Sequence, residues 1–148
     1  MPDAAQTFVD TVILISATLP ATYDESGYDA LADFTAIGQV TDWTPGGKTF
    51  NITTSNPIAQ RGTDKYKGTY NNDADSLTMN RDDDDAGQVK CLAALASDLA
   101  VSFQVIYQDA TEDFFTGKVV SFNTTAGGAD AIVQAVLQVE RVSDTVVS

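Results

Sequence analysis

The sequence predicts a mainly β domain with a single α-helix. Most segments between its turn residues are rich in β-branched and aromatic residues, and 131–142 alternates regularly between apolar and polar positions. Only one segment, about Asp84 to Asp98, has apolar residues at helical spacing. With 148 residues the chain has the length of one domain, so a single domain over 1–148 is expected.

Three strands are expected in the first half of the chain. They are 8–18, 34–43 and 48–54, and the turn sequence TPGG at 44–47 separates the last two. The longer stretch TPGGKT lacks the first glycine of a phosphate-binding loop and precedes no helix, so a turn is the better interpretation. Residues 55–63 contain Pro57 and Gly62 and are expected to form an exposed loop.

The second half predicts hairpins and a long final strand. Segments 64–70 and 76–80 flank NNDAD, whose Asn and Asp residues suit a hairpin loop better than a weak calcium site. Segments 101–107 and 113–122 flank a tight connection, and TAGG at 125–128 turns the chain into 131–142. In that last segment one face is predicted to be buried and is formed by Val133, Ala135, Leu137 and Val139.

The segment RDDDDAGQ at 81–88 is the stretch that most resembles a chemical site. Its four consecutive aspartates, Asp82, Asp83, Asp84 and Asp85, lack the alternation, glycine and final glutamate of a calcium loop. Neighbouring side chains also point apart, which does not suit a pair of catalytic acids. Aspartates do suit the start of a helix, where they meet free N–H groups, and Asp82 or Asp83 is the predicted cap. The charge beyond the cap predicts an exposed acidic patch.

The predicted helix has an apolar stripe on one side. Its members are Val89, Leu92, Ala93, Ala96 and Leu99, with Leu95 at the margin. Cys91 falls outside this arc and is therefore interpreted as a surface thiol with no catalytic role.

Composition narrows the possible functions. The formal net charge is −13, from 21 acidic and 8 basic residues, and such a surface repels nucleic acid and anionic membranes. The chain has no histidine and one cysteine, which removes the common nucleophilic triads and zinc patterns. We therefore expect no enzyme, cofactor or metal site. No signal peptide is evident, and the longest apolar run, 12–15, is too short to span a bilayer.

The order of several motifs resembles the tail tube protein family of long-tailed bacteriophages. The motifs are IGQVTDW, KYKGTYNN, the DDDDAGQVKCLAAL helix and FFTGKVVSF, and the resemblance covers nearly the whole chain. It implies a β-sandwich or half-barrel flanked by one helix. It further implies that six copies form a ring, that the inner strands join into a barrel, and that rings stack into a tube.

Other expectations follow from the same resemblance. Viral double-stranded DNA would pass through a negatively charged bore without specific binding, and the partners would be further copies, a tape measure protein and tail terminator or tip proteins. The chain would be assembled in the bacterial cytoplasm and reside in the virion tail. Residues 1–8 would form an N-terminal arm and 55–67 an exposed loop between rings. The immunoglobulin-like C-terminal domain of some members would be missing.

One basic cluster gives the inter-ring loop a candidate role. Arg61, Lys65 and Lys67 lie in or beside it, and we hypothesise that they contact an acidic surface of an adjacent subunit, with Asp82 to Asp85 a candidate. The alternative is that these bases neutralise acidic groups within their own subunit.

Two other functions remain open on the sequence. A carbohydrate-binding β-sandwich would use Trp43, Tyr23 and Tyr28 as a sugar-stacking surface, although packing in a core or interface is the favoured role for these rings. A capsid-decorating phage protein is the second.

Overall fold

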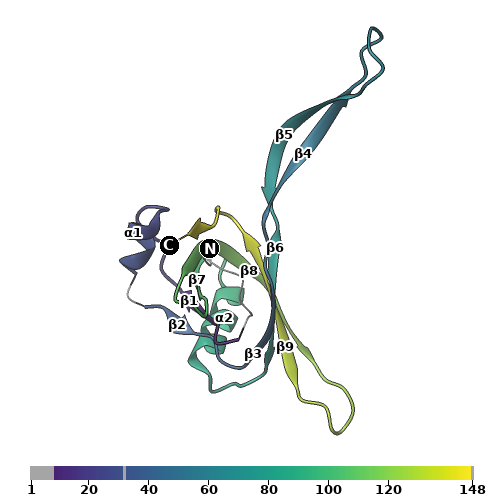
Figure 1. Ribbon diagram of the computed structural model, residues 1–148. Helices are drawn as coiled ribbons and strands as arrows, with labels where there is room; N and C mark the ends of the chain where they lie inside the picture. Colours follow the sequence, from purple (N-terminus) through teal and green to yellow (C-terminus); the bar gives the residue numbers. More distant parts are fainter. Residues whose placement is uncertain (1–8, 32, 148) are drawn as a thin grey trace.

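The computed structural model describes residues 9–31 and 33–147, and the expected arm at 1–8 lies outside them. Within this range the protein is mainly β, as predicted (Figure 1). The larger sheet contains β1 (Val12–Ser16), β2 (Thr35–Ala36), β3 (Val40–Thr44), β6 (Ala74–Asn80), β7 (Val101–Ile106), β8 (Glu112–Thr125), β9 (Gln134–Arg141) and β10 (Val146–Val147). Strands β4 (Lys48–Ser55) and β5 (Asp64–Asn72) form a separate hairpin, and the helices are α1 (Glu25–Asp29) and α2 (Ala86–Ala96).

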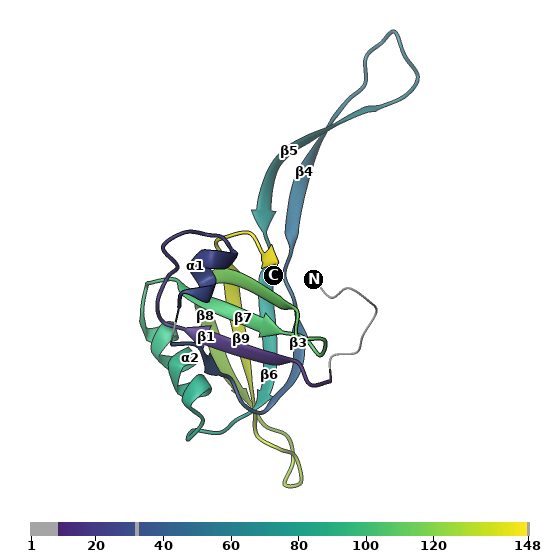
Figure 2. The ribbon, with the colours of Figure 1, turned by 60° about the vertical axis from the view of Figure 1, so that its left-hand side comes forward.

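The larger sheet curls along β8 into a half-barrel, one of the two forms that the family resemblance implies (Figure 2). Its order is β2-β1-β7-β8-β9-β6-β3, with β10 also paired to β8. The first half of β8 pairs with β7 up to Gly117, and the second half pairs with β9 from Gly117 onward. A Cβ at Gly117 would lie 2.5 Å from Val139 Cγ1, so the close approach at this switch requires glycine. A register shift between Val119 and Ser121 follows, and such bulges bend a strand.

The core fills the space between the two parts of the curled sheet. Ile13, Ile15, Phe103 and Phe115 come from β1, β7 and the first half of β8, whereas Leu77, Met79, Leu137 and Val139 come from β6 and β9. The rings of Phe103 and Phe115 stack with centroids 5.1 Å apart. The inward positions of β9 confirm the predicted alternation, except that Val133 precedes the strand and is exposed. Burying each large apolar side chain contributes about 1.5–3 kcal/mol.

The predicted strand 34–43 is wrong as a single element. It is divided into β2, which pairs with β1, and β3, which pairs with β6 at the opposite end of the sheet order. Gln39 between them has a φ of 62°, in the left-handed region that interrupts a strand. The alternating pattern continues across the break because Ile37 and Val40 both face the same core.

The expected turn at 44–47 and the expected hairpin loop NNDAD are both wrong. β3 continues into β4 and β5 continues into β6, so that one long two-stranded ribbon runs out of the body and back (Figure 1). At the junction the Asp73 N–H donates to Gly47 O at 2.7 Å. Proline and glycine at 45–47 therefore interrupt the strands without reversing the chain. The chain reverses at 56–63, where an exposed loop was predicted.

A short second helix, α1, was not predicted. Asp24 caps it by accepting from the Gly27 N–H at 2.8 Å, and this bond lowers the pKa of Asp24. Tyr28 is fully buried, its ring stacks on Phe114, and its hydroxyl lies 2.7 Å from Thr116 Oγ1. Five residues are too few to show a helical period. No helix in the described part of the chain is long and apolar enough to cross a membrane.

Candidate self-assembly surfaces

The acidic run forms the entry to α2. Asp85 is the cap, and its Oδ2 accepts from the backbone N–H groups of Gln88 and Gly38, both at 3.0 Å. The prediction that Asp82 or Asp83 caps the helix, and that the helix begins at Asp84, is therefore wrong by two or three residues. Asp85 is selected because it also satisfies the N–H of Gly38 in the connection between β2 and β3, a tertiary contact invisible in the local sequence.

The other three aspartates remain exposed. The Asp82 side chain accepts from the Asp84 N–H at 3.0 Å, and Asp83 pairs with Arg81 at 2.9 Å. Gln88 is buried and accepts from the Asp82 N–H at 2.9 Å, which orders the segment before the helix. Among residues 9–31 and 33–147, no three His, Cys, Asp or Glu side chains are placed so that they could hold a metal ion together. Asp82 to Asp84 thus form an acidic patch on the surface.

The orientation of α2 is opposite to the prediction. Gly87, Gln88, Cys91 and Ala94 face the body, whereas Val89, Leu92, Leu95 and the following Leu99 are exposed. A Cβ at Gly87 would lie 2.2 Å from Ala36 O, so the helix approaches β2 closely through its small residues. The expectation that Cys91 is a surface thiol is wrong: it is fully buried, which raises the pKa of its thiol to about 12. The apolar stripe that predicted the core face is left outside.

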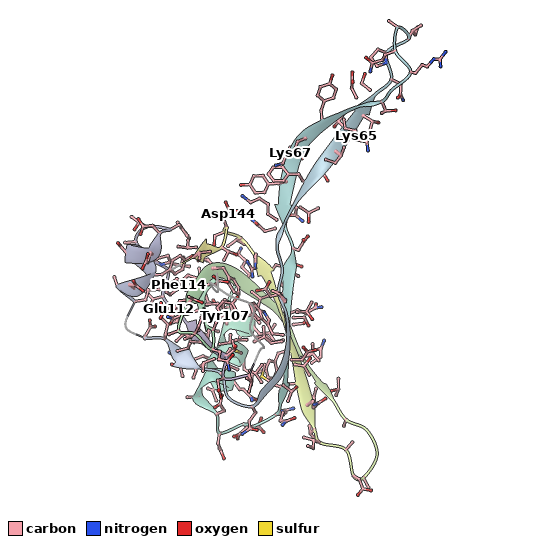
Figure 3. The ribbon with its side chains drawn as sticks, viewed as in Figure 1. Lys65, Lys67, Tyr107, Glu112, Phe114 and Asp144 are labelled. Carbon is pink, nitrogen blue, oxygen red and sulfur yellow. The ribbon has the colours of Figure 1, made fainter. Side chains whose placement is uncertain are left out.

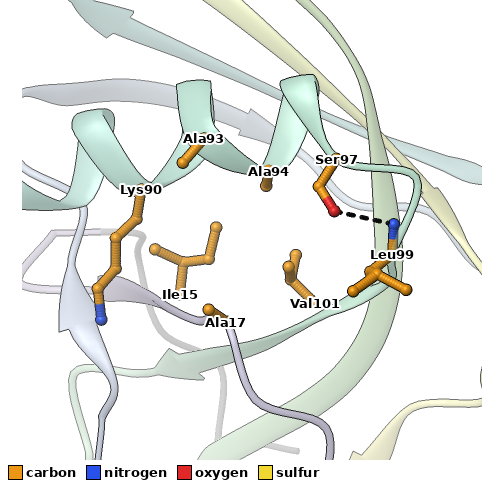
Figure 4. Close-up of a pocket in the computed structure, with 8 residues that line it drawn as sticks. All are labelled: Ile15, Ala17, Lys90, Ala93, Ala94, Ser97, Leu99 and Val101. Atoms are coloured by element: carbon orange, nitrogen blue, oxygen red, sulfur yellow. Dashed lines mark hydrogen bonds between the residues drawn. The ribbon is translucent and has the colours of Figure 1, made fainter.

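An apolar pocket lies where α2 crosses β1 and β7 (Figure 4). Its volume is about 190 Å³. Buried Ile15, Ala94 and Val101 contribute to it, and Leu99 lies beside it with 73% of its surface exposed. The remaining lining residues are Ala17, Lys90, Ala93 and Ser97. The Lys90 ammonium donates to Asp33 O at 2.7 Å, so its charge is held toward the segment before β2.

The β4–β5 hairpin extends away from the body without cover from other described elements (Figures 1 and 2). Ile52, Tyr66 and Tyr70 each expose more than half of their surface. One face combines aromatic rings with cations. On this face Phe50 lies opposite Tyr70, and the Lys67 and Lys48 ammonium groups lie 3.8 and 4.3 Å from the centroids of these two rings, respectively. A two-stranded hairpin alone is marginally stable in water, so this arm is suited to a partner surface.

The predicted basic residues all lie on this arm. Lys65 and Lys67 are on β5, and Arg61 is in the connecting loop (Figure 3). Asp82 to Asp85 follow β6 at the opposite end of the body, so one subunit does not bring the two groups together. The ion pairs of the described residues include Lys48–Asp144, Arg81–Asp83 and Arg141–Asp75.

Charge is divided unequally between the arm and the body. Segment 48–72 holds four of the chain's eight bases and one of its 21 acids, so it carries +3 and the rest carries −16. This arrangement opposes contact between bodies and favours contact between an arm and a body.

A buried ion pair anchors the base of the arm. Asp75 is fully buried and accepts from Arg141 Nε at 2.8 Å and Nη2 at 3.1 Å. It also accepts from the Gly46 N–H, and so joins the β3–β4 junction to β6 and β9. Burial raises the pKa of Asp75, and the hydrogen bonds from Arg141 oppose that rise. The sequence does not predict this pair, since two charges 66 residues apart give no local signal.

The outward face of the β3, β6, β9 and late β8 part of the sheet is polar. Register places Thr44, Ser76, Gln138 and Ser121 in one row and Asp42, Thr78, Val136 and Asn123 in the next. The inward neighbours of these residues include Leu77, Leu137 and Val139. β3 ends this part of the sheet and pairs only with β6 among the described strands, so its other edge is open to a further strand.

The fold is shared with proteins of phage-like tails. One similar structure is from the tail of an empty gene transfer agent particle, with 14% identity, a TM-score of 0.70, and 97% of this chain and 99% of that chain covered. The SPP1 tail tube has 12% identity, a TM-score of 0.64, and coverage of 94% and 76%. The anti-feeding prophage baseplate has 9% identity, a TM-score of 0.67, and coverage of 100% and 97%.

At these identities the likeness shows the fold, which is the tail tube type expected from the motif order. No family model matches the sequence, and no curated protein sequence does either.

Proposed function

We propose that this protein is a tail tube protein whose copies form rings that stack into a conduit for viral double-stranded DNA. The observation that carries the proposal is the uncovered cationic arm on a strongly acidic body of tail tube fold. An arm of this kind has a use only when a second copy receives it. Its eight-residue strand β4 spans about 26 Å at 3.3 Å per residue, enough to reach well across a neighbouring body.

Six copies in each ring are proposed from the similar assemblies. The gene transfer agent tail is described with C6 symmetry, and the anti-feeding prophage baseplate is six-fold symmetrised. The open edge of β3 would pair with a neighbour's strand, which removes an edge that otherwise promotes aggregation. In such a ring the polar outward face of β3, β6, β9 and late β8 is suited to line the bore.

The proposed bore would guide DNA by repulsion and weak contact. Its hydroxyl and amide side chains offer no array of cations to duplex phosphates, which occur about every 1.7 Å. Acid near the bore repels phosphates over a Debye length of about 8 Å at physiological salt. We further propose a tape measure protein and terminator or tip proteins as partners, assembly in the bacterial cytoplasm, and final residence in the virion tail.

The arm contact is tested by reversing its charge. The subunit of the variant R61E/K65E/K67E should remain folded by circular dichroism, because all three side chains are exposed. Negative-stain images and light scattering should show tubes for the parent protein and only rings or short stacks for the variant. The matched control K118E changes an exposed lysine on β8, away from the arm. Tubes of normal length from the triple variant would refute the arm contact.

The carbohydrate-binding alternative has less support. It needs several exposed aromatic rings, but Tyr28 is fully buried. Trp43 is half-buried, and its ring centroid lies 6.5 Å from that of Tyr107. Tyr23 alone of the three is well exposed. Saturable binding to a glycan array by a stable monomer would favour this alternative.

A further inference from the structure

The tip of the arm presents one apolar side chain to solvent. Ile58, in the loop 56–63, is fully exposed, at 104% of the reference area. The loop around it is internally bonded: the Gln60 N–H donates to Pro57 O at 3.2 Å, and the Thr63 hydroxyl donates to Asn56 Oδ1 at 2.6 Å. These bonds define the loop conformation that presents Ile58 outward.

The body of the same subunit does not cover the Ile58 side chain. The arm carries the tip away from the curled sheet in both views of the molecule (Figures 1 and 2). Ile58 therefore offers one apolar side chain whose burial against a second molecule would be favourable. A partner surface for Ile58 therefore needs an open apolar cavity of the size of one side chain.

The pocket between α2, β1 and β7 has these properties. Apolar side chains of Ile15, Ala94 and Val101 contribute to its lining, and its volume of about 190 Å³ admits one branched aliphatic side chain (Figure 4).

The opposite net charges of the arm and the body favour the arm of another copy as the occupant of the pocket. Asp98 lies between the lining residues Ser97 and Leu99 and is exposed, whereas Arg61 lies three residues after Ile58 on the tip. The arm carries +3 and the body −16, so long-range attraction brings the tip toward a body. Lys90 is the cationic residue in the pocket wall. Its ammonium group donates to Asp33 O, so this hydrogen bond is already satisfied within the subunit.

We propose that Ile58 of one copy inserts into the pocket between α2, β1 and β7 of a second copy, with Arg61 beside Asp98. The inference rests on the proposed stacking of rings and specifies the receiving surface of the arm. The acidic patch at Asp82 to Asp84 would then attract the arm at long range, while the pocket provides the short-range fit.

Disulfide trapping tests the contact directly. I58C and A93C are prepared as separate proteins, mixed, oxidised and examined on a non-reducing gel. Native Cys91 is retained because it is fully buried. A cross-linked dimer should form in the mixture and in I58C with L99C, but not in either single variant alone. The control V120C places the thiol on an exposed position of β8 outside the pocket and should give no product with I58C.

A second measurement removes the side chain without a cross-link. I58S should raise the protein concentration needed for tubes by roughly tenfold to a hundredfold, from the free energy of burying one isoleucine. The control I132S removes another exposed isoleucine, in the β8–β9 connection, and should leave that concentration unchanged.

The outcomes separate this inference from the proposed function. If the parent protein forms tubes, I58S forms them equally well and no I58C–A93C product appears, the pocket contact is refuted and the tube proposal stands. If A93C cross-links to T7C and not to I58C, the N-terminal segment is the occupant and the inference is also refuted. If the parent protein forms no rings or tubes, the tube proposal fails, and the gel still decides whether the tip meets the pocket.

Discussion

Cys91 shows how strongly a single residue reports on packing. Its thiol is fully buried on the side of α2 that faces the body. Burial raises the pKa of the thiol to about 12, because the thiolate would lose its hydration. The native protein should therefore not react with a thiol-specific disulfide reagent at pH 8, and reaction should appear only with unfolding in urea. Rapid modification of the native protein would place Cys91 on the surface and contradict the helix orientation.

Asp85 contributes more to stability than its three acidic neighbours. It accepts two backbone hydrogen bonds that link α2 to the connection between β2 and β3. The variant D85A should lose about 1–2 kcal/mol in urea unfolding, in the range of helix-cap substitutions. D84A is the matched control and should change the unfolding free energy by less than about 0.5 kcal/mol. Equal losses for the two variants would show that the run acts as undifferentiated charge.

At the scale of elements, the arm depends on the ion pair at its base. Asp75 connects the β3–β4 junction to Arg141 on β9, and removing it leaves the guanidinium buried with one hydrogen bond to Thr145. D75A should lose about 3–5 kcal/mol of unfolding free energy, as expected for breaking a buried pair. The double variant D75A/R141M should recover part of this loss, since it removes the uncompensated charge. Urea denaturation of both variants gives the comparison.

Elements also differ in how well local sequence predicted them. The final strand was found because one face is buried and the other is wet, which creates a period of two. The ribbon from β3 to β6 was divided wrongly, because proline and glycine interrupt the strands here without turning the chain. The apolar stripe of α2 was found, but its direction was inverted, since a helix can contact its own body through small residues and offer the larger ones to another molecule.

At the scale of the whole molecule, the proposed bore can be tested at the polar outward face of β3, β6, β9 and late β8. A cysteine at Gln138, in the centre of this face, is exposed in the single subunit. In the monomeric protein Q138C should react with both a small maleimide and a maleimide on a large polymer. After assembly the small reagent should still react, and the large one should not enter the bore. Full reaction with the polymer reagent in tubes, measured by gel shift, would place this face outside.

The candidate surfaces were only partly accessible to sequence reasoning. Arg61, Lys65 and Lys67 were identified as a cluster because they are close in the chain, and the structure places them on one arm. The pocket was missed because Ile15, Ala94 and Val101 come from three elements and have no shared pattern. The Asp75–Arg141 anchor was missed for the same reason.

The sequence alone determined the class of the protein: its strand periodicity, its acid-led helix and its charge all come from residues close together in the chain. Local chemistry is enough there, because alternation, capping and net charge depend on neighbours. The tertiary structure alone decided which face of α2 is covered, where the ribbon leaves the body and which aspartate caps. Those outcomes depend on contacts between distant segments, where close packing of Gly87 on Ala36 and the bonds of Asp85 and Asp75 outweigh the local apolar pattern.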